Sequence, residues 1–188
     1  MRFMRYIIMM LAIVLAGMFV YNLFLPDSYS VTRSITIAAP ASVVYEQVAD
    51  LKKYEKWSPW FEGDETIEKE WGETTRGQGA SFVWKSTEHG EGSFEVVEAV
   101  EPSKVVSKLD FGGQGQARAQ WTFDEEAGST KVTWLFDGET SGVFAGYMAL
   151  MIETMVGPQF EHGLKTLQKV VESTPVAEGA AELPAEEG

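Results

Sequence analysis

Residues 39–61, APASVVYEQVADLKKYEKWSPWF, contain the strongest local pattern in the chain and predict a short helix that delivers aromatic rings to a core. Pro40 is compatible with the first helical turn, where a backbone N–H has no intrahelical partner. Val44, Val48 and Leu51 then recur at the spacing of one helical face. Ser58-Pro59 indicates a turn after the helix. A cluster of aromatic residues lies where the helix ends: Tyr54, Trp57, Trp60 and Phe61.

Patterns typical of β-strands precede this helix and follow it. Residues 30–38 alternate between two faces. One face holds Val31, Arg33, Ile35 and Ile37, and the other holds Thr32, Ser34 and Thr36. Six further strands are predicted after the helix, at residues 66–73, 79–86, 92–100, 105–111, 116–123 and 130–137. Short connections such as EHGEG and GGQG are typical of hairpins. The succession predicts a curved antiparallel sheet with one polar face and one aromatic face.

Two helical patterns and an acidic segment follow the last strand. Residues 141–152, SGVFAGYMALMI, contain no charge but are too few to span a bilayer. They are compatible with a short helix packed on the sheet, or with a gate over a cavity that touches a nearby membrane. Residues 158–173 predict an amphipathic helix, with Phe160 and Leu164 on its apolar face. Residues 174–188 contain four Glu and no basic residue, which is typical of a disordered tail.

The N-terminal segment predicts a membrane anchor. Residues 6–25, YIIMMLAIVLAGMFVYNLFL, contain no charge, and as a helix at 1.5 Å per residue they span roughly 30 Å, the thickness of the hydrocarbon layer. A cleaved signal peptide is the alternative, with Val14 and Ala16 as a weak cleavage pattern. Because Arg2 and Arg5 precede the span, we expect a cytoplasmic N-terminus and an extracytoplasmic domain, periplasmic in a Gram-negative cell.

Composition and charge exclude several classes of protein. The 188 residues include 15 Lys and Arg against 28 Asp and Glu, for a net charge of −13, so a nucleic-acid partner is not expected. Arg2 and Arg5 are the basic residues before residue 26, and no acidic residue precedes it, so the remaining chain has a formal charge of −15. The absence of cysteine excludes a disulfide scaffold, a thiolate metal site and a cysteine nucleophile.

Several motifs resemble one superfamily. The segment from Ala39 to Asp50, with the aromatic residues after it, resembles the opening of SRPBCC proteins, and more narrowly the bacterial polyketide cyclase/dehydrase family of the START/Bet v 1-like fold. Three motifs further along the chain resemble later motifs of the same family: Gly77-x-Gly79, Thr130-Lys131-Val132-x-Trp134 and Gly157-x-x-Phe160-x-x-Gly163-Leu164. The resemblance implies an α+β helix-grip fold, a curved antiparallel sheet around a long C-terminal helix, here preceded by one transmembrane helix. The expected organisation is a cytoplasmic N-terminus at 1–5, a transmembrane anchor at 6–25, a linker at 26–30, the helix-grip domain at 31–173 and an acidic tail at 174–188.

The resemblance also implies an internal apolar cavity, which relatives use for lipids, sterols, polyketides or other hydrophobic ligands. The number of rings on the predicted inner face agrees with a cavity, although the same rings could simply fill a core. The residues expected to line the cavity are Trp57, Trp60, Phe82, Trp84, Phe94, Phe111, Trp121, Phe123, Trp134, Phe136, Tyr147, Met151, Phe160 and Leu164.

Candidate catalytic chemistry is sparse. His89 and His162 are both expected to face solvent, so neither a metal site nor a cofactor is predicted, and the catalytic residues, if any, are unknown. Asp50 and Ser58 are expected in capping and turn roles. A charge-rich stretch is expected to form a solvated face: Asp64, Glu65, Glu68, Glu70 and Glu73.

The sequence therefore predicts a single-pass, membrane-anchored domain that binds a hydrophobic small molecule or lipid. Two alternatives stay open. One is an enzyme of the polyketide cyclase/dehydratase type, which would orient a flexible substrate with few catalytic groups. The other is a protein-interaction or chaperone-like domain with a filled core and an exposed apolar patch at residues 142–155, whose protein partner is unknown.

Overall fold

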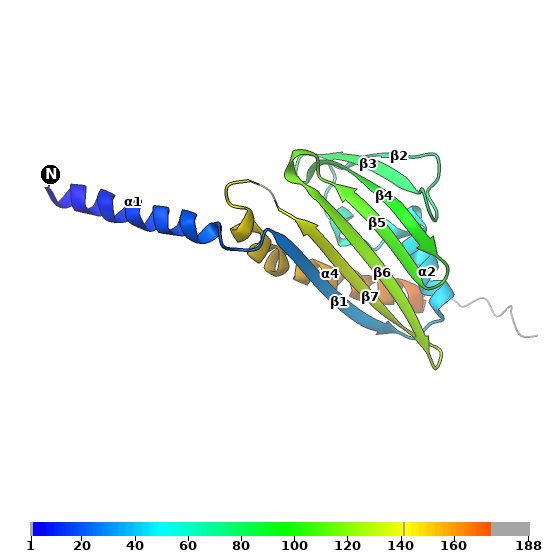
Figure 1. The fold of residues 1–188 in the computed structure, drawn as a ribbon. Helices are drawn as coiled ribbons and strands as arrows, with labels where there is room; N and C mark the ends of the chain where they lie inside the picture. The colour runs from blue at the N-terminus through cyan, green and yellow to red at the C-terminus, as the bar shows by residue number, and fades with distance from the viewer. Residues whose placement is uncertain (1, 141, 174–188) are drawn as a thin grey trace, which may run out of the picture.

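The computed structural model describes residues 2–140 and 142–173 and shows one twisted sheet, a long helix across it and a second long helix leading away from it (Figure 1). The strands are β1 (Ser28–Ile37), β2 (Glu68–Trp71), β3 (Ser81–Ser86), β4 (Gly90–Val100), β5 (Lys104–Asp110), β6 (Gln116–Glu126) and β7 (Ser129–Glu139). The helices are α1 (Arg2–Asn22), α2 (Ala41–Ala49), α3 (Leu51–Tyr54) and α4 (Ala145–Ser173), with short 3₁₀ turns at Pro59–Phe61 and Gly112–Gln114.

The seven strands form one antiparallel sheet in the order β1-β7-β6-β5-β4-β3-β2. Consecutive strands from β2 to β7 are neighbours, so hairpins make most of the sheet, while β1 crosses over to pair with β7. On β6 and β7, Trp121 lies opposite Trp134, and both are buried. The predicted curved sheet with an aromatic inner face is therefore confirmed.

Helix α4 lies across the inner face and is longer than the sequence pattern indicated. We expected separate helical segments at 141–152 and 158–173, but one 29-residue helix begins at Ala145 and contains Pro158. A proline removes one intrahelical hydrogen bond, and Arg33 of β1 attaches the helix to the sheet on both sides of it. Arg33 of β1 lies 3.0 Å from Glu161, which follows the proline, and 3.6 Å from Glu153, which precedes it.

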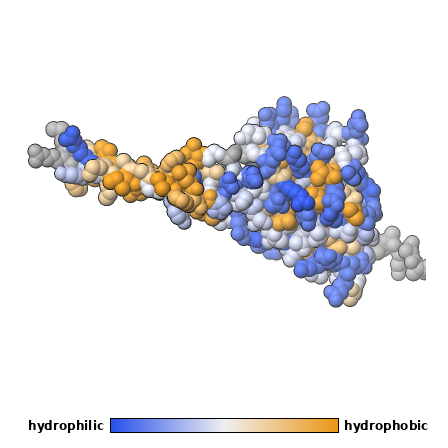
Figure 2. Space-filling model, viewed as in Figure 1, coloured by the Kyte–Doolittle hydropathy of each residue, from blue (hydrophilic) through white to orange (hydrophobic). Residues whose placement is uncertain are grey.

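Helix α1 leads away from the domain, and its surface is apolar (Figure 2). Among the described residues, Phe3–Asn22 is one helix that is long and apolar enough to cross a membrane. It ends at Asn22, three residues before the expected boundary, because Leu23 and Phe24 turn back through backbone bonds to Val20 and Tyr21. The expected tail at 174–188 lies outside the described residues.

Candidate functional site: an aromatic cavity beside helix α4

A cavity of about 490 Å³ lies between the inner face of the sheet, formed by β3 to β5 and the adjoining ends of β1, β6 and β7, and the first half of α4. Its volume is within the range of small-molecule sites. Most of its wall is apolar. The lining residues are Tyr29, Tyr54, Trp60, Phe61, Ile67, Phe82, Trp84, Glu88, His89, Gly90, Phe94, Leu109, Phe111, Gly115, Gln116, Phe136, Glu139, Thr140, Met148, Ile152, Met155 and Val156.

The sheet side of the cavity is a wall of packed rings. Phe82 and Phe94 lie opposite each other on β3 and β4 and stack, with centroids 5.3 Å apart and planes 11° apart. Trp84 meets the next ring, Phe111, edge to face at 5.8 Å. Gly92 lies opposite Trp84 in the register, and a Cβ there would clash with the indole and with a backbone carbonyl of β5. Gly92 is therefore what lets the indole of Trp84 lie flat across β4.

The opposite wall comes from α4 and is the open side. Met148, Ile152, Met155 and Val156 face the cavity from three successive helical turns. The exposed fractions of Met148 and Met155 are 48% and 60%, so these two side chains form the rim of the mouth as well as part of its wall. Methionine side chains are flexible and polarisable, which suits a wall that must accommodate ligands of differing shape.

Next to the cavity, the rest of the inner face is filled. Trp121 stacks on Trp134 with centroids 4.0 Å apart, and Trp134 stacks on Phe160 at 3.7 Å with planes 7° apart. The edge of Trp57 meets both tryptophans, at 5.5 and 6.3 Å. Gly163 allows α4 to approach this stack closely, since a Cβ there would clash with Pro59. These rings form a closely packed core, and the cavity lies directly beside it on the inner face of the sheet.

The comparisons with known proteins agree with this architecture. Residues 28–172 match the family model described as polyketide cyclase / dehydrase and lipid transport. The chain belongs to this family. No curated protein matches the chain by sequence.

Solved structures share the fold of this polyketide cyclase/dehydrase domain at low identity. A Chromobacterium violaceum protein is 16% identical, with a TM-score of 0.57 over 77% of this chain and 98% of its own. The crystal structure of Ara h 8.0201 is 14% identical, with a TM-score of 0.58 over 78% and 99%. A Thermobifida fusca protein is 20% identical, with a TM-score of 0.57 over 76% and 92%. At these identities, the likenesses establish the helix-grip fold alone.

The structure divides the fourteen residues expected at the cavity of this polyketide cyclase/dehydrase domain into two groups. Six lie on its wall: Trp60, Phe82, Trp84, Phe94, Phe111 and Phe136. Eight lie elsewhere: Trp57, Trp121, Phe123, Trp134, Tyr147, Met151, Phe160 and Leu164. Most of these eight are buried in the core, because the second half of α4 covers that part of the sheet. Tyr147 packs against Tyr21 of α1, and Met151 faces outward.

Other lining residues were missed, although some had a signal in the sequence. Leu109 shares one strand face with Phe111, and Met148 and Met155 belong to a stripe at helical spacing. Tyr29 shares the alternation of Val31 but precedes the expected strand start. The hairpin residues at the mouth, Glu88 to Gly90, carry no such pattern.

Asp64 corrects the expectation of a wholly solvated acidic stretch. Its carboxylate is buried and accepts hydrogen bonds from the hydroxyls of Ser86 and Thr66, at 2.5 and 2.6 Å, and from the Thr66 backbone N–H at 2.8 Å. These bonds, first of all that from Ser86, lower the pKa of Asp64 below its ordinary value. His89 Nε2 lies 3.9 Å from Asp64 on the cavity rim, and its side chain is 48% exposed. Asp64 thus fixes the hairpin that carries His89.

Tyr54 is a buried residue of the cavity lining that carries a hydroxyl. It ends α3 and packs against Trp57 at 4.9 Å and Phe94 at 5.6 Å. Burial raises the pKa of Tyr54 to about 12, with a smaller opposing effect from the hydroxyl of Ser58. The phenol is therefore a neutral polar group within an aromatic wall.

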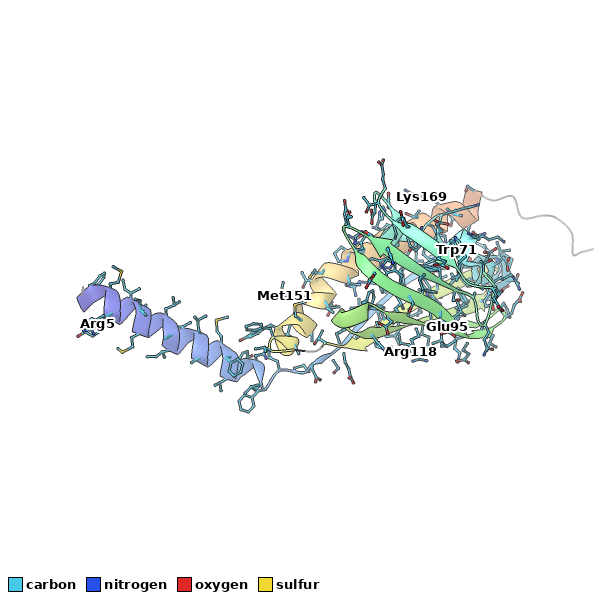
Figure 3. The ribbon with its side chains drawn as sticks, turned by 90° about the horizontal axis from the view of Figure 1, so that it is seen from above. Arg5, Trp71, Glu95, Arg118, Met151 and Lys169 are labelled. Carbon is cyan, nitrogen blue, oxygen red and sulfur yellow. The ribbon has the colours of Figure 1, made fainter. Side chains whose placement is uncertain are left out.

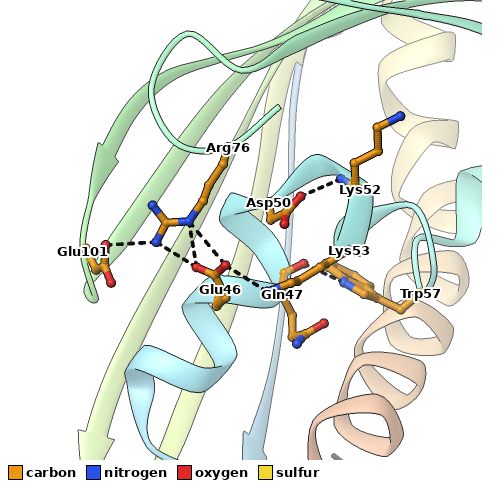
Figure 4. Close-up of polar contacts among 8 residues, drawn as sticks. All are labelled: Glu46, Gln47, Asp50, Lys52, Lys53, Trp57, Arg76 and Glu101. Carbon is orange, nitrogen blue, oxygen red and sulfur yellow. Dashed lines mark hydrogen bonds and ion pairs between the residues drawn. The ribbon is translucent and has the colours of Figure 1, made fainter. Parts of the chain in front are cut away.

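The polar cluster around α2 has a structural role (Figure 4). Arg76 binds both carboxylate oxygens of Glu46, and this bond lowers the pKa of Glu46. Arg76 also reaches Glu101, and the two contacts attach the loop before β3 to α2. Asp50 caps α3 by accepting from the Lys52 N–H at 2.9 Å, as expected. The Trp57 indole donates to the Gln47 carbonyl, which holds Trp57 in the core.

No group of three or more metal-ligating side chains occurs within residues 2–140 and 142–173. His162 is exposed and lies 2.6 Å from Glu62, away from the cavity wall. The lining itself forms a largely apolar cavity with a few polar side chains, among them His89, Gln116 and Thr140.

Proposed function

We propose that this chain is a membrane-anchored member of the polyketide cyclase/dehydrase family that binds a hydrophobic small molecule or lipid. The observation that carries the proposal is the contrast within one inner face. The stack of Trp121, Trp134 and Phe160 is closely packed, whereas beside it about 490 Å³ stays open between rings of the sheet and the first half of α4. An open apolar space is costly to keep unless something occupies it.

The composition of the wall supports a neutral, largely apolar ligand. Rings and aliphatic side chains surround most of the cavity, and Gln116, Thr140 and His89 at the mouth of the cavity could form hydrogen bonds with a ligand. Glu88 and Glu139 also lie there, and the domain has a strong negative charge. An anionic head group is therefore disfavoured, and a hydroxyl, ester or zwitterionic head is compatible.

The proposed anchor supports a ligand that dissolves in membranes. Helix α1 has the length and apolar surface of a membrane span, and its side chains from Phe3 to Tyr21 are exposed, with contacts to the domain confined to its last turn. With Arg2 and Arg5 on the cytoplasmic side, the domain lies outside the cytoplasm. A tethered domain meets ligands of the same membrane at a high effective concentration.

Co-purification tests the proposal. The full chain is extracted from membranes in detergent, and the small molecules that it carries are identified by mass spectrometry. Leu109→Trp fills part of the cavity, and Val83→Trp makes the same kind of change on the exposed face of β3. We expect one molecule per chain, lost several-fold in Leu109→Trp and retained in Val83→Trp. Equal amounts in both variants would show that the molecules only surround α1, and the proposal would fail.

Cyclase or dehydratase activity is the second candidate, favoured by the position of His89. It is the histidine of the cavity lining, and Asp64 lies 3.9 Å from it, so it could accept a proton from a bound substrate. The same preparation tests this role. A dehydratase would leave a product one water lighter in the native chain than in His89→Gln, whereas a binding protein would carry the same molecule in both.

A further inference from the structure

The first turns of α4 expose an apolar surface that the domain does not cover. Six side chains on or just before these turns are about half exposed or more: Val143, Phe144, Met148, Leu150, Met151 and Met155. Four of them, at positions 144, 148, 151 and 155, share one stripe at helical spacing. In Figure 3, Met151 lies at the end of α4 nearest to α1, and Lys169 lies at the far end. A concentrated apolar surface of this kind marks a contact site.

Specific hydrogen bonds attach this surface to the end of α1. Asn22 is buried, its amide Nδ2 donates to the Val143 carbonyl at 2.8 Å, and its Oδ1 accepts from the Tyr147 N–H at 3.2 Å. The Tyr147 hydroxyl donates to the Met18 carbonyl at 2.9 Å. At Gly146 the start of α4 approaches the chain at the end of α1 so closely that a Cβ would clash with Leu25, three residues beyond α1. These contacts fix the position of the apolar surface relative to the proposed membrane span.

The contact with Met18 also fixes the depth of the surface. Met18 lies four residues before the end of α1, which corresponds to about 6 Å along a helix. The Tyr147 side chain thus reaches back to the last turn of α1, and the start of α4 lies directly beside the end of the span. Amphipathic helices rest at about 5–10 Å within the boundary between head groups and acyl chains. An apolar surface held at this depth is in the layer that lipid occupies.

We propose that the exposed surface from Val143 to Met155 lies in the interface of the bilayer that α1 crosses, so that the cavity mouth opens against lipid. This inference rests on the proposed function, because it requires α1 to be a membrane anchor. Met148 and Met155 belong both to this surface and to the cavity wall, so the mouth and the membrane contact coincide. A lipid-soluble ligand would then pass between membrane and cavity without crossing water.

Continuity and charge favour lipid as the occupant over a second protein. The apolar colour of α1 continues onto the part of the domain nearest to it in Figure 2, so one lipid phase could cover both. The domain has a large negative charge, and Asp27 and Glu139 lie near the mouth, where Thr140 bonds the Asp27 carbonyl. We therefore expect contact with zwitterionic lipid, driven by apolar burial and insensitive to salt.

Site-directed spin labelling of the full chain tests this contact, since the natural chain has no cysteine. The variants Phe144→Cys, Met151→Cys and, as control on the same helix, Lys169→Cys are labelled and reconstituted into phosphatidylcholine vesicles. Phe144 and Met151 are not part of the cavity wall. Accessibility to oxygen, which concentrates in lipid, is compared with accessibility to a water-soluble nickel chelate. We expect the oxygen-to-nickel ratio to be several-fold higher at 144 and 151 than at 169.

The possible outcomes separate the two proposals. Equal ratios at 151 and 169 would overturn the membrane contact, even if the purified chain carries a cavity ligand. Labels at 144 and 151 that are shielded from both reagents and broadened by spin–spin interaction would show that a second copy covers the surface, which also overturns it. A lipid-exposed label at 151 in a chain that carries no ligand would support the contact and refute the binding function.

Discussion

Phe160→Ala is expected to be among the most destabilising single changes in the domain. Phe160 is fully buried, stacks on Trp134 at 3.7 Å and meets the edges of Trp60 at 6.1 Å and Phe136 at 5.7 Å. Removing its ring loses the burial of a whole aromatic side chain and leaves a void in a filled region. Such changes cost about 3–5 kcal/mol of unfolding free energy.

Phe111→Ala is the matched control, because the same chemical change is made at the wall of the cavity. Phe111 is half-buried and has one edge contact, with Trp84 at 5.8 Å. Its removal widens an existing space, so we expect a cost of about 1–2 kcal/mol. Urea unfolding of the full chain in detergent measures both, since all six tryptophans lie between Trp57 and Trp134 and report on the domain. Equal costs for the two variants would refute the division into core and cavity.

Three further outcomes are expected. In the folded protein the pKa of Tyr54 is about 12, against an ordinary value of 10.0. The stability that the neutral phenol contributes is therefore complete below pH 10 and is lost as the pH rises toward 12. Urea midpoints across this range should fall in the native chain and fall less in Tyr54→Phe. Gly92→Ala should displace the ring of Trp84 and destabilise the domain by about 1–3 kcal/mol, with a shift in tryptophan emission; an unchanged spectrum and midpoint would contradict the close approach. Asp50→Ala should cost about 1 kcal/mol through loss of the cap on α3, and Asp50→Asn should retain most of it, as thermal unfolding can show.

The sheet was predictable because alternation in the sequence reports directly which side chains share a face. The segment 116–123 placed Trp121 and Phe123 together, and both are buried in β6. Strand ends were less accurate, since β6 continues to Glu126 through residues that pair across a hairpin without burial. Pairing depends on the partner strand, which a local pattern does not describe.

The division between core and cavity was not predictable from the same alternation. Trp134 and Trp84 occupy equivalent inward positions on their strands, yet one is stacked in the core and the other lines the cavity. The difference depends on where α4 crosses the sheet. That crossing rests on small residues such as Gly163 and on the attachment of Arg33 on β1 to both sides of Pro158. These are contacts between segments far apart in the sequence.

The role of the uncharged segment before Pro158 was only partly predictable. Its methionine stripe indicated a surface that contacts something apolar, and its length excluded a second membrane span. Its attachment to α1 depends on Asn22, which in the sequence is a polar residue within an apolar run. Its role as a bridge to Val143 and Tyr147 is visible only once the two helices are placed together.

Photo-crosslinking from the cavity wall tests the binding function most directly, because it uses the full chain in its own membrane and captures a ligand of any identity. p-Benzoylphenylalanine replaces Phe111 on the cavity wall in one variant and Val83 on the exposed face of β3 in the other. After irradiation in cells, we expect a single apolar small molecule attached at position 111 and none at position 83. Attachment at position 111 only to another segment of the same chain would show that the space is closed and would contradict a ligand-binding cavity.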